Sequence, residues 1–177
     1  MAVLAGPFLV SSALLGAGGA LKVAHPHTTA RALRSVGLPA SPTVVRLGAA
    51  AEVAVAVAAL ATGGRPVAAL VAASYLGFAA FVVAALRADV PLSSCGCFGG
   101  QDTPPTAVHL ALNLLAALVA GAVALGWAGS GGGVAVAVTD MNGSLVLKAA
   151  FVVATAASAW LAYLALTVLP RLQGARR

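Results

Sequence analysis

Residues 67–86 read VAALVAASYLGFAAFVVAAL, a run of twenty residues without a charged side chain. A helix that crosses the hydrocarbon core of a bilayer needs about 20 mainly apolar residues. Arg87 follows directly, and a basic residue at the end of such a run is typical of a membrane boundary. The stretch therefore predicts a membrane-spanning α-helix from Val67 to Leu86.

Four further apolar segments have the length of a span. They are Val3 to Leu21, which Lys22 follows, residues 43–62, which contain Glu52, a segment from Pro104 and Pro105 to Trp127, and residues 145–169. The first could instead be a cleaved signal peptide, but no Lys or Arg precedes it, so we interpret it as a span. The sequence thus predicts an all-α polytopic membrane protein with five transmembrane helices.

The composition supports this fold class. Hydrophobic residues make up 61% of the 177 residues, charged residues 8%, and the mean hydropathy is +1.02. Soluble domains are nearer half apolar and a quarter charged, so a soluble enzyme, a disordered tail and a disulfide-rich secreted scaffold are excluded. The net charge of +6 comes from ten Lys and Arg that lie between the apolar runs and form no continuous patch. We therefore expect the lipid bilayer, and no nucleic acid, as a partner.

The spans predict three parts of the chain. Residues 1–127 form a four-helix membrane domain that includes a loop at 88–103. Residues 128–144 are a linker, flexible because of its glycines, and residues 145–177 hold the fifth span and a basic tail. The fifth helix is thus predicted to be appended to a four-helix unit.

A short helix is predicted between the first two spans, at residues 27–36. Arg31 and Arg34 would lie on its polar side, and Gly37 would end it. We expect this helix to lie at the membrane interface rather than to cross the bilayer.

The only two cysteines, Cys95 and Cys97, lie in the string SSCGCFGG of the predicted loop. A structural disulfide is disfavoured, because a three-residue loop constrains the unfolded chain very little. A metal site would need further ligands from His25, His27 or His109. A redox-active pair is the third alternative, since so tight a disulfide in a glycine-containing loop would be strained and readily reduced. The spacing favours the redox pair and leaves two alternatives open: a metal-handling membrane protein and a non-catalytic membrane scaffold.

The string SCGCFG at residues 94–99 resembles the signature of the MauE family of membrane proteins, which are grouped with DoxX-like proteins. The similarity covers roughly residues 14–125 and includes Gly37-Leu38-Pro39 and Glu52. The resemblance implies a redox-associated membrane protein that acts in methylamine utilisation. It would help to mature methylamine dehydrogenase, a disulfide-rich periplasmic enzyme, beside a thioredoxin-like partner.

The predicted four-helix unit is also similar to vitamin K epoxide reductase and DsbB, which pass electrons between dithiols and quinones. Those proteins carry a Cys-x-x-Cys motif and a second cysteine pair, and this chain has neither. An internal relay between two cysteine pairs is therefore excluded. The resemblance implies no firmly bound cofactor and leaves a quinone open.

Three polar residues within the spans are candidates to support the cysteines. Glu52 lies about nine residues into its span, about 13 Å deep, where a carboxylate is costly unless protonated or paired. It is either functional or a protonated side chain that hydrogen-bonds between helices. His109 and Asn113 share a helix face, about 7 and 13 Å below the loop. We expect a polar ladder from the cysteines to Glu52 that tunes a thiolate and moves its proton.

Charge and chemistry predict different sides of the membrane for the cysteine loop. With five spans, the loop shares its side with eight basic residues, against Arg65 and Lys148 on the other side. The positive-inside rule makes the richer side cytoplasmic. Disulfides, however, are made and used in oxidising compartments. We expect a plasma-membrane protein with an extracytoplasmic loop, where a thioredoxin-like protein would reach it.

Overall fold

The computed structural model describes residues 4–88, 105–127, 138 and 144–167. These residues form six helices and no strand: α1 (Ala5–Ala24), α2 (Pro26–Ser35), α3 (Pro42–Thr62), α4 (Arg65–Arg87), α5 (Ala107–Ala124) and α7 (Leu145–Thr167). Five of them, all except α2, are long and apolar enough to cross a membrane. The prediction of an all-α protein with five spans is confirmed.

Capping residues place the helix ends close to the predicted positions. Ser41 precedes α3, and its hydroxyl accepts a hydrogen bond from the Val44 N–H at 3.2 Å. Gly63 ends α3 with a φ of 59°, the left-handed conformation that favours glycine. α5 begins at Ala107 rather than near Pro104, because Thr106 still has an extended backbone.

The short helix predicted at residues 27–36 is α2, which begins one residue earlier, at Pro26. Arg31 and Arg34 are exposed, whereas Ala30 and Ala32 are buried. A short helix with one basic face and one buried face suits the plane of a membrane interface. Its placement there stays a prediction.

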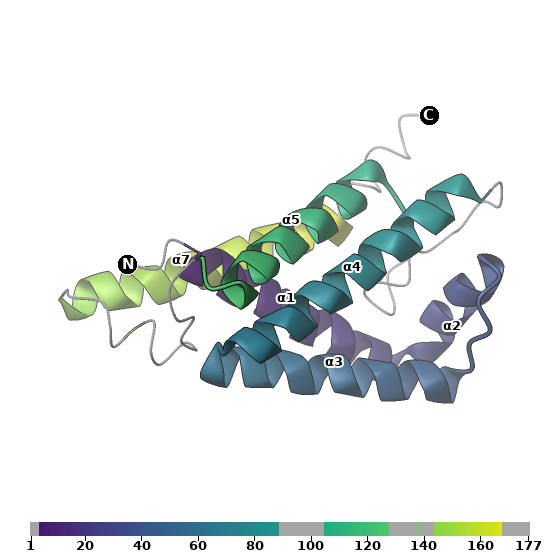
Figure 1. Ribbon diagram of the computed structural model, residues 1–177, viewed down its shortest axis with the longest axis horizontal. Helices are drawn as coiled ribbons and strands as arrows, with labels where there is room; N and C mark the ends of the chain where they lie inside the picture. Colours follow the sequence, from purple (N-terminus) through teal and green to yellow (C-terminus); the bar gives the residue numbers. More distant parts are fainter. Residues whose placement is uncertain (1–3, 89–104, 128–137, 139–143, 168–177) are drawn as a thin grey trace.

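The spanning helices lie along the long axis of the molecule (Figure 1). α1 packs chiefly on α3, α4 packs on α5, and α7 lies against α1. The two-residue turn at Gly63 and Gly64 makes α3 and α4 antiparallel. One end of the bundle therefore collects the end of α1, all of α2, the start of α3, the end of α4 and the start of α5. This end is called the α2 end below.

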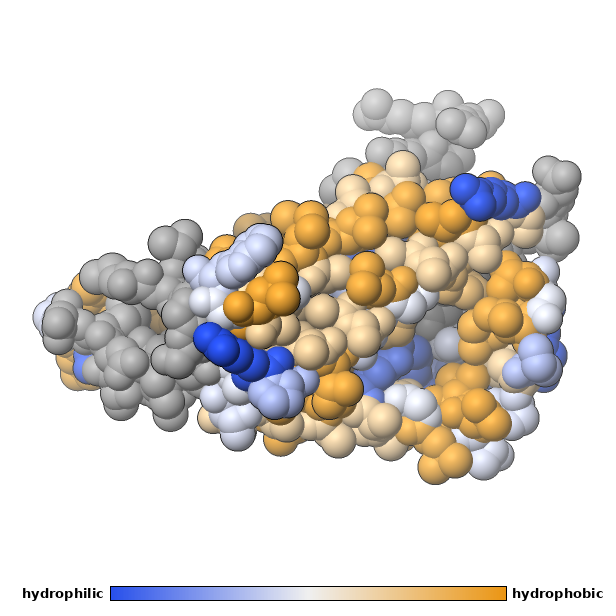
Figure 2. All heavy atoms as spheres, viewed as in Figure 1, coloured by the Kyte–Doolittle hydropathy of each residue, from blue (hydrophilic) through white to orange (hydrophobic). Residues whose placement is uncertain are grey.

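Small side chains fill the space between the helices. The buried core cluster has ten members, and five of them are alanines, which let helix backbones approach closely. Large apolar residues such as Leu47, Leu118 and Trp160 are instead more than half exposed. Figure 2 shows apolar side chains over most of the visible face. Such a surface is suited to lipid rather than to water.

Candidate functional site

α1 and α3 approach each other most closely around Gly19. A Cβ atom on Gly19 would lie 2.9 Å from Val53 Cγ2, closer than side chains tolerate. Gly16 packs in the same way, since its Cβ would lie 3.1 Å from the Ala56 Cβ. Both glycines are therefore positions at which the two helices pack closely. The close approach also brings the last turn of α1 within reach of Glu52.

Lys22 of α1 and Glu52 of α3 form an ion pair. Lys22 is only 4% exposed, and its Nζ lies 4.3 Å from the centroid of the Phe78 ring in α4, a cation–π contact. Glu52 Oε2 is buried and has no hydrogen-bond partner among the described residues. Charge attraction to Lys22, rather than a directed hydrogen bond, therefore compensates its burial.

The prediction that Lys22 lies just beyond the first span is wrong. α1 continues to Ala24, and Lys22 lies inside the bundle. The ammonium meets both a carboxylate and an aromatic face there, which offsets the cost of taking it out of water. One signal could have indicated this: Glu52 is the only acidic residue within the predicted spans, and ionisable groups at such depth are almost always paired.

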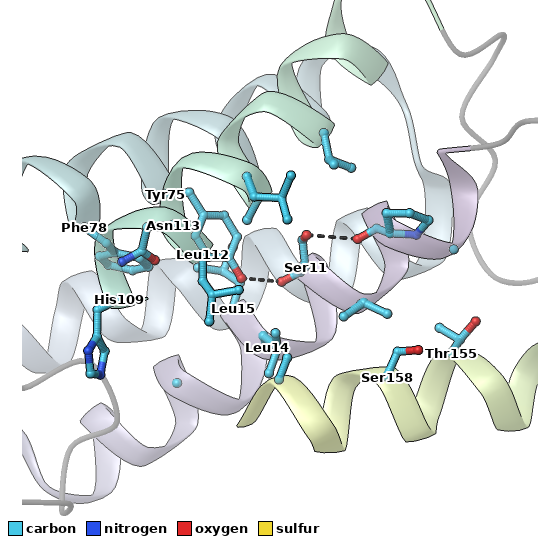
Figure 3. A pocket seen from close by; sticks show the side chains of 18 of the residues that line it. Ser11, Leu14, Leu15, Tyr75, Phe78, His109, Leu112, Asn113, Thr155 and Ser158 are labelled. Carbon is cyan, nitrogen blue, oxygen red and sulfur yellow. Dashed lines mark hydrogen bonds between the residues drawn. The ribbon is translucent and has the colours of Figure 1, made fainter. Parts of the chain in front are cut away.

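Tyr75 joins α4 to α1. Its hydroxyl donates a hydrogen bond to the Ser11 carbonyl oxygen at 2.6 Å (Figure 3). Its ring also meets Phe78 edge to face, with 5.8 Å between the ring centroids. Tyr75 and Phe78 thereby hold α4 against the part of α1 that leads to Lys22.

His109 and Asn113 face the interior from α5. His109 is fully buried, and its Nδ1 forms a 2.9 Å hydrogen bond with the Thr106 hydroxyl. Asn113 is 9% exposed, and its amide has no hydrogen-bond partner among the described residues. Both side chains line the same cavity (Figure 3).

This cavity has a volume of about 550 Å³ and lies between α1, α4, α5 and α7. Its lining on α1 extends from Gly6 to Lys22, about 24 Å at 1.5 Å per residue. Most of the lining is apolar, and its most polar side chains, Lys22, His109 and Asn113, lie toward the α2 end. The volume is typical of a site for a small molecule. α7, predicted as an appended helix, supplies one wall through Phe151 and its neighbours.

The predicted ladder residues are connected in the structure by Lys22, a residue that the prediction did not include. His109 and Asn113 line the cavity together with Lys22, whereas Glu52 does not line it. Glu52 connects to the cavity because it pairs with Lys22. The cavity therefore has a polar end made of one ion pair, one imidazole and one amide.

Cys95 and Cys97 lie outside the described residues. The described chain leaves α4 at Arg87 and resumes before α5, which begins two residues ahead of His109. Both points lie at the α2 end. The segment that carries the cysteines is therefore attached to the bundle at the polar end of the cavity.

His25 and His27, the candidate metal ligands, are exposed where α1 meets α2. No group of three or more His, Cys, Asp or Glu that could hold a metal ion occurs in the described ranges. The cysteines that the metal hypothesis needs are outside those ranges, so that hypothesis stays a prediction.

The comparisons with known proteins agree with the resemblance seen in the sequence. The family model described as methylamine utilisation protein MauE matches residues 1–129, a range that includes α1 to α5 and the cysteine string. Comparison with curated proteins and with solved structures finds no match. The family match covers well over half of the chain and stops before α7. The chain therefore belongs to the MauE family and is a multi-pass membrane protein linked to methylamine utilisation.

Proposed function

We propose that this protein is a membrane thiol–disulfide redox protein in which Cys95 and Cys97 are the exchanging pair. One observation carries the proposal: the only two cysteines of the chain lie on either side of Gly96, inside the range that matches the MauE family. Its partner would be a thioredoxin-like extracytoplasmic protein. The process served would be disulfide formation in an extracytoplasmic enzyme such as methylamine dehydrogenase.

The exchange is a two-electron reaction between two cysteine pairs. A partner thiolate attacks one sulfur of the Cys95–Cys97 disulfide, which forms a mixed disulfide and releases the other sulfur as a thiolate. The second partner thiolate then breaks the mixed disulfide. Cys95 and Cys97 end as two thiols that have gained two electrons and two protons, and the partner ends with one disulfide. The reverse reaction uses the same steps, and the two reduction potentials set the direction.

His109 is the described side chain best placed to handle the thiol proton. It lies in the first turn of α5, at the end of the bundle to which the cysteine segment is attached. Its ring is already oriented by the hydrogen bond to Thr106. Asn113, one turn further along, and Glu52, through Lys22, would support it as positioning residues. His109, Asn113 and Glu52 together form the proposed ladder.

Burial of Lys22 weakens the charge argument for a cytoplasmic loop. Since Glu52 neutralises Lys22 inside the bundle, Lys22 no longer acts as a free topological charge. Arg46 lies within α3, and residues 171–177 follow the fifth span. Setting these aside, the remaining basic residues are Arg31, Arg34 and Arg87 on the cysteine side, against Arg65 and Lys148 on the other. This bias is too small to fix the orientation, so the redox chemistry decides for an extracytoplasmic loop, where a disulfide persists.

Thiol trapping tests the redox proposal directly. The purified protein is labelled with a mass-tagged maleimide before and after reduction, beside a variant with both cysteines replaced by serine. We expect two tags only after reduction. Equal labelling with and without reduction would contradict a reversible disulfide. Stoichiometric zinc or copper that depends on both cysteines would favour the metal site instead.

The side of the membrane needs its own measurement. Intact cells are treated with a permeant reductant and then with a membrane-impermeant maleimide. We expect Cys95 and Cys97 to be labelled without lysis. Labelling that appears only after lysis would place the loop in the cytoplasm and remove the proposed partner.

A further inference from the structure

Asn113 is a buried polar group without a partner in the wall of the cavity. Its side chain is about nine-tenths buried, and no described residue hydrogen-bonds to its amide. The other buried polar side chains of the described lining are satisfied: Tyr75 and Ser11 donate to backbone carbonyls, His109 bonds a hydroxyl, and Lys22 pairs with a carboxylate. The amide is not among the fully enclosed atoms and faces the cavity, where an amide without a partner in apolar surroundings is costly. A bound molecule with a hydrogen-bonding group would remove that cost.

The other residues that line the cavity indicate the chemical character of the rest of the bound molecule. Nearly all of the lining is apolar, and it extends along α1 from Gly6 to Lys22. Such a space is filled by an elongated lipophilic group rather than by water, since water needs several polar partners. Lys22, the only charged residue in the described lining, is already neutralised by Glu52. An anionic head group would have to compete with that carboxylate, so the site favours an uncharged ligand.

We propose that the cavity between α1, α4, α5 and α7 binds an uncharged lipophilic molecule whose carbonyl oxygen accepts a hydrogen bond from Asn113. The carbonyl lies toward the α2 end, and the apolar tail extends toward Gly6 and Phe151. Two membrane components share this chemistry: a quinone with an isoprenoid tail and a neutral glyceride with ester carbonyls. None of the described lining residues is a cysteine, so binding in the cavity can be measured separately from the proposed thiol exchange, with which it shares Asn113 and His109.

Native mass spectrometry of the full-length protein in detergent can count bound molecules. The probes are decylubiquinone, dioctanoylglycerol and dodecylbenzene, the last of which carries no oxygen. We expect one molecule of an oxygen-bearing probe per chain, bound more tightly than dodecylbenzene. Asn113→Leu should weaken the preferred probe about tenfold, the effect of losing one buried hydrogen bond, and leave dodecylbenzene unchanged. Whichever oxygen-bearing probe binds more tightly identifies the natural source, and either result supports the proposal.

Two variants on α5 locate the bound molecule. Ala116 lines the cavity, whereas Leu118 on the same helix is 71% exposed on the outer face. Ala116→Phe should abolish binding of all three probes, and Leu118→Phe should leave it unchanged. Binding that survives Ala116→Phe would overturn the proposal. So would equal affinity of the wild type for all three probes, or an unaltered preference in Asn113→Leu, a variant that keeps the side-chain volume and removes only the amide.

Discussion

The buried ion pair predicts an asymmetric response to removing its two partners. Glu52→Leu strands the Lys22 ammonium at a site where it is 4% exposed, which should lower the free energy of unfolding by about 3–5 kcal/mol. Lys22→Met should lower the free energy of unfolding by less, about 1–3 kcal/mol. Methionine keeps the packing against Phe78, and the Glu52 side chain is 19% exposed. The double variant Lys22→Met with Glu52→Leu should return to within about 1 kcal/mol of the wild type.

Unfolding by SDS in mixed micelles, followed by the helical circular dichroism signal, gives the four free energies of this double-mutant cycle. The expected coupling between Lys22 and Glu52, which is the two single losses together less the loss in the double variant, is about 3–7 kcal/mol. Lys148→Met is the control, because Lys148 has no acidic partner in the described part of the chain; it should change stability by less than about 0.5 kcal/mol. A double variant that loses as much stability as the two single variants together would show no coupling and would refute the reasoning.

Four further variants test the packing and the proton role. Gly19→Ala should lower the free energy of unfolding by about 1–3 kcal/mol in the same titration, because its methyl group meets Val53. Gly48→Ala, whose added Cβ would have nothing within 4 Å, should raise it by up to about 1 kcal/mol. Equal effects would contradict the close helix contact. Tyr75→Phe keeps the ring but loses the hydrogen bond to α1, which should cost about 1 kcal/mol; no loss would show that this bond contributes nothing. His109→Asn should slow thiol exchange with a thioredoxin reporter about 100-fold; an unchanged rate would exclude a proton role.

The helices could be predicted because their causes are local. Residues 67–86 satisfy the length requirement of a bilayer by themselves, and the structure extends that helix by only two residues at one end and one at the other. Gly37 follows the C-terminal end of α2 with a φ of 84°, and its position after Val36 predicted that the helix ends there. Each such feature depends on a few neighbouring residues, and a single sequence contains that information.

The cavity could not be predicted because it depends on contacts between distant helices. Lys22 follows an apolar run, so its position resembled a membrane boundary, and its partner lies thirty residues further along the chain. Its depth in the span predicts that Asn113 is a candidate site residue, but a sequence does not show that an amide lacks a hydrogen-bond partner. The contribution of α7 to the cavity wall could not be predicted either, because the glycine-rich composition of the preceding linker indicated a separate helix.

Lys22 belongs both to the ion pair and to the cavity, so Glu52 should control which ligands the cavity accepts. While the pair is intact, the polar end carries no net charge. Glu52→Gln keeps a side chain of similar size but leaves the ammonium uncompensated, and an isolated charge of this kind seeks a new partner. The variant should therefore gain affinity for palmitate relative to decylubiquinone, by about tenfold or more for one charge-assisted contact. Native mass spectrometry with both probes measures the change. An unaltered preference would mean that the cavity does not sense the charge of Lys22, and the argument for an uncharged ligand would then fail.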